Sequence, residues 1–156
     1  MKRVALIVVV VVAVCTASFA GTSVASIKGP YNFQLSGVRN FFGYYNGGTF
    51  VPVSGACPSN QHCQSQAFAT VFTGVVSFDG QGHVTFVSVS SVNGGGGSPD
   101  AGAVWVYDVS GYNGAMTGGQ GSLYLTLGSF NSAGVATVLT LRTGNGNPLT
   151  GVATLQ

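Results

Sequence analysis

Apolar and polar residues alternate with a period of two in several stretches of this chain, and such a period predicts β-strands. The clearest stretch is 31–36, where Tyr31, Phe33 and Leu35 interleave with polar residues. Alternation or a high content of β-branched residues marks six later stretches: 66–78, 84–92, 105–110, 122–127, about 135–143 and 149–155. No stretch after the N-terminal segment has a helical period. We therefore predict an all-β protein.

Turn-forming residues separate the expected strands. Segments 78–82 and 130–134 share the pattern F-[D/N]-x-x-G, in which the Asp79 or Asn131 side chain can cap a tight hairpin. Further turns are expected at Tyr45-Asn46-Gly47, at Tyr112-Asn113-Gly114 and at 144–148. The glycine-rich stretch 94–99 is expected to be a long hairpin loop rather than a domain linker.

About eight strands joined mostly by short turns predict an antiparallel meander, with the strand at 41–53 the least regular. A meander of this size removes its exposed edges by closing on itself. We expect a closed, lipocalin-like barrel. A two-sheet β-sandwich would bury the same faces and is the alternative.

The N-terminal segment has the features of an export signal. Lys2 and Arg3 precede the apolar run 4–14, and Ser18 and Ala20 place small residues before a cleavage site. We predict cleavage after Ala20, which divides the chain into a signal peptide (1–20) and one secreted domain (21–156). The protein is then secreted, periplasmic or held at the cell surface, and touches a membrane only through the cleaved signal. Lipid attachment at Cys15 is an alternative.

Removal of the signal leaves a mature domain with few charges and no net charge, because its three cations equal its three aspartates. The charged residues are Lys28, Arg39, Arg142, Asp79, Asp100 and Asp108. Nucleic-acid binding requires a concentrated basic surface. We therefore expect no nucleic-acid partner.

Cys57 and Cys63 remain as an even pair after cleavage, and in an oxidising compartment they are expected to form a disulfide. The alternative is a metal site in which His62 joins both cysteines and His83 supplies a fourth ligand. This spacing matches no established zinc pattern.

The inventory of catalytic groups is small: three aspartates, two histidines and many hydroxyls. No G-x-S-x-G sequence accompanies the serines, and 94–97 lacks the lysine of a phosphate-binding loop. We predict no enzymatic activity and no cofactor. Asp79 and His83 are expected to serve the turn and a strand start, and Asp108 is expected to face solvent unless a partner such as Arg142 allows it to be buried.

Three short motifs resemble a group of small secreted bacterial β-proteins without a defined activity. They are G-x-Y-x-F at 29–33, F-D-G-x-G at 78–82 and G-x-x-x-L-Q at 151–156. Gly29-Pro30-Tyr31 is also distantly similar to the G-x-W start of lipocalins, which implies a barrel open at one end with Arg142 as a stacking partner.

Several aromatic residues are not explained by strand alternation, namely Phe41, Phe42, Tyr44, Tyr45 and Phe50. They are either core residues around a bulge or ligand contacts near a barrel mouth, together with Trp105 and Tyr107. We interpret the protein as a binding module for a small apolar or glycan ligand. The alternative is a structural or adhesive protein that self-associates, because the domain has no net charge and few charged residues protect its strand edges.

Overall fold

The computed structural model describes residues 22–93, 99–119, 121–144 and 148–156. A short 3-10 helix, η2 (Val24–Ser26), precedes the first strand. The strands are β1 (Lys28–Asn46), β2 (Thr49–Pro52), β3 (Gln64–Asp79), β4 (His83–Val92), β5 (Val104–Ser110), β6 (Asn113–Gly118), β7 (Gly121–Leu127), β8 (Val138–Thr143) and β9 (Thr150–Leu155). Within these ranges no helix is long and apolar enough to cross a membrane.

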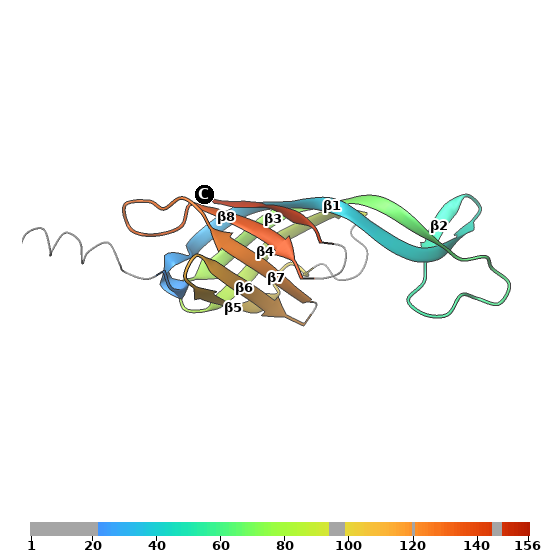
Figure 1. Ribbon diagram of the computed structural model, residues 1–156, viewed down its shortest axis with the longest axis horizontal. Helices are drawn as coiled ribbons and strands as arrows, with labels where there is room; N and C mark the ends of the chain where they lie inside the picture. Colours follow the sequence, from blue (N-terminus) through green and yellow to red (C-terminus); the bar gives the residue numbers. More distant parts are fainter. Residues whose placement is uncertain (1–21, 94–98, 120, 145–147) are drawn as a thin grey trace, which may run out of the picture.

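Eight of the strands form a closed antiparallel barrel (Figure 1). β1 pairs with β3, each strand from β3 to β8 pairs with the next, and β9 returns to β1. The closing register runs from Tyr31 opposite Leu155 to Ser36 opposite Thr150. The predicted all-β meander is thus confirmed. Because β9 pairs with β1 and closes the sheet, the fold is a barrel and not the alternative sandwich.

The barrel interior is packed with apolar side chains, and they are the alternating residues expected from the sequence. In β1 these are Tyr31, Phe33 and Leu35, and in β7 they are the leucines at 123, 125 and 127. Two glycines let a neighbouring strand approach more closely than any residue with a Cβ would allow. A Cβ at Gly151 would lie 1.8 Å from the Gln34 carbonyl oxygen, and one at Gly74 would lie 2.0 Å from that of Ser88.

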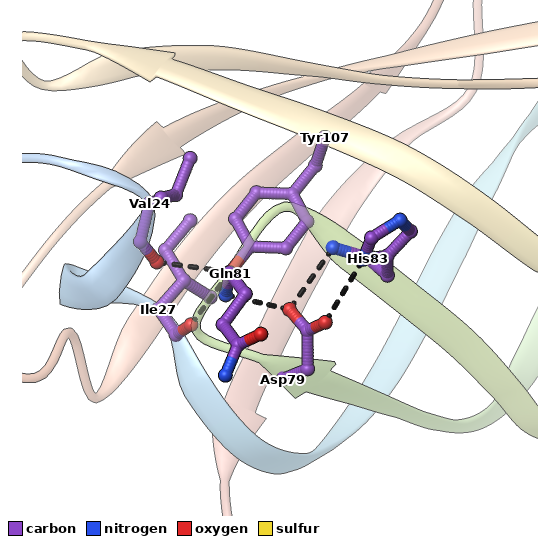
Figure 2. Close-up of polar contacts among 6 residues, drawn as sticks. All are labelled: Val24, Ile27, Asp79, Gln81, His83 and Tyr107. Atoms are coloured by element: carbon purple, nitrogen blue, oxygen red, sulfur yellow. Dashed lines mark hydrogen bonds and ion pairs between the residues drawn. The ribbon is translucent and has the colours of Figure 1, made fainter.

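One end of the barrel is closed by η2 and by the β3–β4 and β5–β6 turns, and we call it the closed end (Figure 1). The Tyr107 hydroxyl donates toward the carbonyl oxygens of Val24 (2.9 Å) and Ile27 (3.0 Å), as Figure 2 shows. The Tyr31 hydroxyl donates to the Ala136 carbonyl oxygen. Burial raises the pKa of Tyr31 to about 12 and also raises the pKa of Tyr107.

β1 and β3 are much longer than the other strands and continue past the other end of the barrel as a ribbon (Figure 1). β2 pairs with the end of β1, from Gly43 opposite Pro52 to Asn46 opposite Thr49. The single strand expected at 41–53 is therefore two antiparallel strands. Their turn contains Gly47 and Gly48, whose φ angles of 56° and 84° favour glycine.

The two F-[D/N]-x-x-G turns are confirmed and have the same hydrogen bonds. Asp79 Oδ1 accepts from the backbone N–H groups of Gln81 (2.6 Å) and His83 (3.0 Å), seen in Figure 2. Asn131 Oδ1 accepts in the same way from Ala133 and Val135, both at 3.0 Å.

The expected turn at Tyr112-Asn113-Gly114 lies slightly earlier in the chain. The β5–β6 connection is Gly111-Tyr112, and Asn113 already pairs with Ser110. Gly111 has a φ of 59° and provides the left-handed residue there. The expected loop at 94–99 and the turn at 144–148 lie largely outside the described residues.

Candidate functional site

The open end of the barrel contains a cavity of about 240 Å³, which we call the mouth cavity. Most of its lining is apolar and comes from the inward faces of β1, β3, β4, β5 and β7. Its described lining residues are Phe33, Leu35, Arg39, Phe72, Phe86, Val89, Pro99, Trp105, Gly121, Ser122, Leu123, Thr143, Gly144 and Leu149.

Trp105 forms part of one wall, and a neighbouring glycine makes room for its ring. A Cβ placed on Gly118 would lie 2.4 Å from the indole. The Trp105 ring meets Phe86 at an edge-to-face centroid distance of 5.1 Å, and Phe86 meets Phe33 at 6.2 Å. These aromatic contacts hold the wall in place on strands of the barrel rather than on loops.

Polar groups lie at the rim of the mouth cavity. Ser122 and Thr143 come from β7 and β8, whereas Arg39 comes from the part of β1 that leaves the barrel. The Arg39 guanidinium carbon lies 5.6 Å from the centroid of the Phe41 ring, in the range of a cation–π contact. Phe68 of β3 is the register partner of Arg39.

The ribbon carries an aromatic cluster on the face that continues the barrel interior. Phe68 contacts Phe41 and Phe50 at centroid distances of 5.8 and 5.2 Å, and Phe50 contacts Tyr45 at 5.4 Å. A second hollow of about 310 Å³ lies here, lined by Phe41, Thr49, Phe50, Pro52, Phe68 and Asn93. Phe41 thus contacts both Arg39 at the rim and the cluster beyond it.

The structure separates the aromatic residues that the sequence suggested as ligand contacts. Trp105 lines the mouth cavity. Phe41, Tyr45 and Phe50 form the ribbon cluster with Phe68. Phe42 and Tyr44 have the opposite strand parity and point to the other face of the ribbon.

Tyr107 lies at the closed end, where backbone carbonyls engage its hydroxyl, so it is not a residue of the mouth. Sequence reasoning did not name Phe33, Leu35, Phe72 and Phe86 as cavity residues. Their alternation was visible in the sequence, but it marks every inward position of a barrel. These four differ from the other inward residues only in lying nearer the open end of the barrel.

No family model, curated protein or solved structure matches the chain. The structure therefore establishes the antiparallel barrel fold alone.

Cys57 and Cys63 form the predicted disulfide, with their Cα atoms 5.9 Å apart. This bond lies in the connection between β2 and β3 at the ribbon tip. It excludes the metal site that needed both thiolates. Elsewhere in the described ranges no three His, Cys, Asp or Glu side chains gather as metal ligands.

The remaining polar side chains that the sequence singled out serve local structure. His83 Nδ1 lies 3.0 Å from Asp79 Oδ2 (Figure 2), and the N–H groups of His83 and Gln81 help to lower the pKa of Asp79. Asp108 faces solvent as expected, and its Oδ1 accepts from the N–H of Val109 at 2.7 Å. His62 is exposed in the disulfide loop.

Proposed function

We propose that this protein is a secreted, non-catalytic barrel that binds a small apolar ligand in the mouth cavity. The observation that carries the proposal is a largely apolar hollow at the open end of a barrel whose other end is closed and packed. Preformed cavities of this kind, with a few polar groups at the rim, are the usual form of a small-molecule site.

The lining favours an apolar ligand over a glycan. Phenylalanine, leucine, tryptophan, valine and proline side chains supply most of the described wall, and the polar side chains lie at the rim. A sugar placed there would lose hydrogen bonds to water without replacing most of them. The volume of about 240 Å³ is many times that needed for one water molecule and can admit an alkyl chain.

The site provides its own reporter, because Trp105 is the single tryptophan of the chain. We expect 1-octanol to change its fluorescence saturably, whereas glucose and maltose leave it unchanged. Val89→Phe adds bulk at a half-buried lining position and is expected to weaken octanol binding at least about tenfold. Val152→Phe, on the exposed face of β9, is the matched control and leaves binding unchanged.

Two results would reject this function. One is a folded protein whose Trp105 emission shows no saturable response to octanol. The other is an equal response in the Val89→Phe variant, which would place the binding elsewhere.

Export is a separate part of the proposal and rests on the N-terminal residues, which lie outside the described ranges. N-terminal sequencing of exported protein is expected to begin at Gly21. An intact Met1 or a lipidated Cys15 in exported material would contradict it.

Self-association is a second candidate, favoured by a strand edge that has no described neighbour. β4 pairs with β5 from His83 to Thr85, and Phe86 still exchanges backbone hydrogen bonds with Ala103 and Gly102. From there to Val92 the strand pairs with β3 alone among the described strands. No charged side chain lies in Val87–Val92. An uncharged strand edge is a surface to which a second copy of the same strand can pair.

A further inference from the structure

Arg39 is the only cationic side chain among the described residues that line the mouth cavity. It is partly buried, and its guanidinium lies against Phe41 while Phe68 is its partner across the ribbon. A guanidinium that lies against an aromatic ring at the rim of an apolar hollow is less free to move than a fully solvated one. An anionic group is the ligand chemistry that such a position complements.

The other charged side chains are placed differently. Lys28 lies opposite Asp79 near the closed end, and Arg142 is exposed on the outer face of β8. Asp108 points outward from β5, and Asp100 is an exposed residue of the β4–β5 connection. No carboxylate belongs to the described lining of the cavity, whereas one guanidinium does.

The geometry also fixes the order of apolar and charged parts along the site. Phe33, Leu35 and Arg39 are on one face of β1, so the guanidinium lies outward of the apolar wall along the strand. Arg39 lies four positions after Leu35 on an extended strand, a distance of about 13 Å. A ligand that satisfies both parts has one charged end at the rim and an apolar chain directed into the barrel.

We propose that the ligand is a single-chain carboxylate, with its alkyl chain in the mouth cavity and its carboxylate bound by Arg39. This inference rests on the proposed function and specifies its ligand class. Arginine binds a carboxylate through two parallel N–H···O bonds, which gives geometric selection for the anion over a neutral head group. The cavity volume of about 240 Å³ has room for an alkyl chain beside the rim.

Octanoate and 1-octanol form a matched pair of probes, because they have the same chain length and differ in the charge of the head group at pH 7. Titration followed by Trp105 fluorescence is expected to show octanoate binding at least about tenfold more tightly than octanol. Arg39→Gln is expected to remove most of this difference, by weakening octanoate binding about tenfold and octanol binding much less. Arg39→Lys retains part of the preference, and Arg142→Gln retains all of it.

Octanol binding by the Arg39 variants shows that they are folded and that the cavity is intact. Equal affinity of the wild-type protein for octanoate and octanol would overturn the carboxylate inference and leave the apolar binding function standing. A preference for octanoate that persists in Arg39→Gln would also overturn it. A wild-type protein that binds neither probe would reject the proposed function itself.

Discussion

At the scale of single residues, the two capped turns allow a direct test of what an acceptor oxygen contributes. Asp79 and Asn131 occupy the same pattern and accept the same two backbone N–H bonds. Asp79→Asn keeps an acceptor, so we expect a much smaller fall in melting temperature at pH 7 than for Asp79→Ala. Equal losses in both variants would show that the carboxylate charge stabilises the turn, not the acceptor geometry.

The charge of Asp79 adds a dependence on pH. Its pKa is lowered from the ordinary 3.8, first by the backbone N–H of His83, so the folded state favours the carboxylate. This stabilisation is present above that ordinary value and is lost as the pH falls through the lowered folded-state pKa. Asp79→Asn has no carboxylate to protonate there. Its melting temperature is expected to change less than that of the wild type in acid, and an identical acid profile would contradict this.

The buried tyrosines predict a loss of stability in alkali. Burial raises the pKa of Tyr31 from 10.0 to about 12. The phenol stays neutral in the folded state while it ionises in the unfolded one, so stability is complete below pH 10 and falls as the pH rises toward 12. Denaturant titrations of Tyr31→Phe are expected to show a flatter profile in this window. Tyr124→Phe, at an exposed position, is expected to keep the wild-type slope.

Residue patterns in the sequence were sufficient for the Asp79 and Asn131 turns, because a cap depends on neighbours within four positions. They were insufficient for Tyr107, whose hydroxyl engages carbonyls 83 and 80 residues away in the chain. Alternation marked Tyr107 correctly as inward-facing. It gave no information on which end of the barrel the residue occupies.

At the scale of elements, the disulfide stabilises the ribbon tip and not the barrel. Cys57 and Cys63 are separated by six positions, and closing so short a loop contributes about 2 kcal/mol by the loop-entropy rule. In the double variant Cys57→Ser/Cys63→Ser we expect faster amide hydrogen exchange in 53–63, with unchanged protection in β7. Loss of protection in β7 as well would show that the disulfide supports the whole fold.

The ribbon is the element that the sequence described least well. Its strands alternate like those of the barrel, but from Arg39 onward aromatic residues occur on both faces of β1. A strand that leaves the barrel exposes both faces to different surroundings, so the usual contrast between apolar and polar positions is lost. For this reason Phe42 and Tyr44 were grouped with Phe41 and Tyr45, although the two pairs lie on opposite faces of the ribbon.

At the scale of the whole molecule, the number of short hairpins favoured closure into a barrel, because a meander of eight strands otherwise has two exposed edges. The pairing of β1 with β9 was needed to exclude a sandwich. The location of the mouth cavity did not follow from the number of hairpins. It depends on which strands end early and which continue, and neighbouring strands set these limits through packing. The same geometry leaves part of β4 without a described neighbour on one side, a feature that the sequence alone did not indicate.

That edge leads to a prediction for the domain that the proposed export would leave, 21–156, which has no net charge and hence no long-range repulsion between copies. We expect sedimentation velocity to show association that grows with protein concentration and changes little with salt. Val92 is 61% exposed, in the part of β4 that has no described strand on its β5 side. It becomes a charged edge residue in Val92→Lys, which is expected to keep the protein monomeric. Val152→Lys adds the same charge at a 48% exposed position of β9, a strand paired on both sides, and is expected to associate like the wild type. Equal suppression of association by both lysine variants would assign the effect to net charge instead of the strand edge. A wild-type protein that stays monomeric at every concentration would contradict self-association.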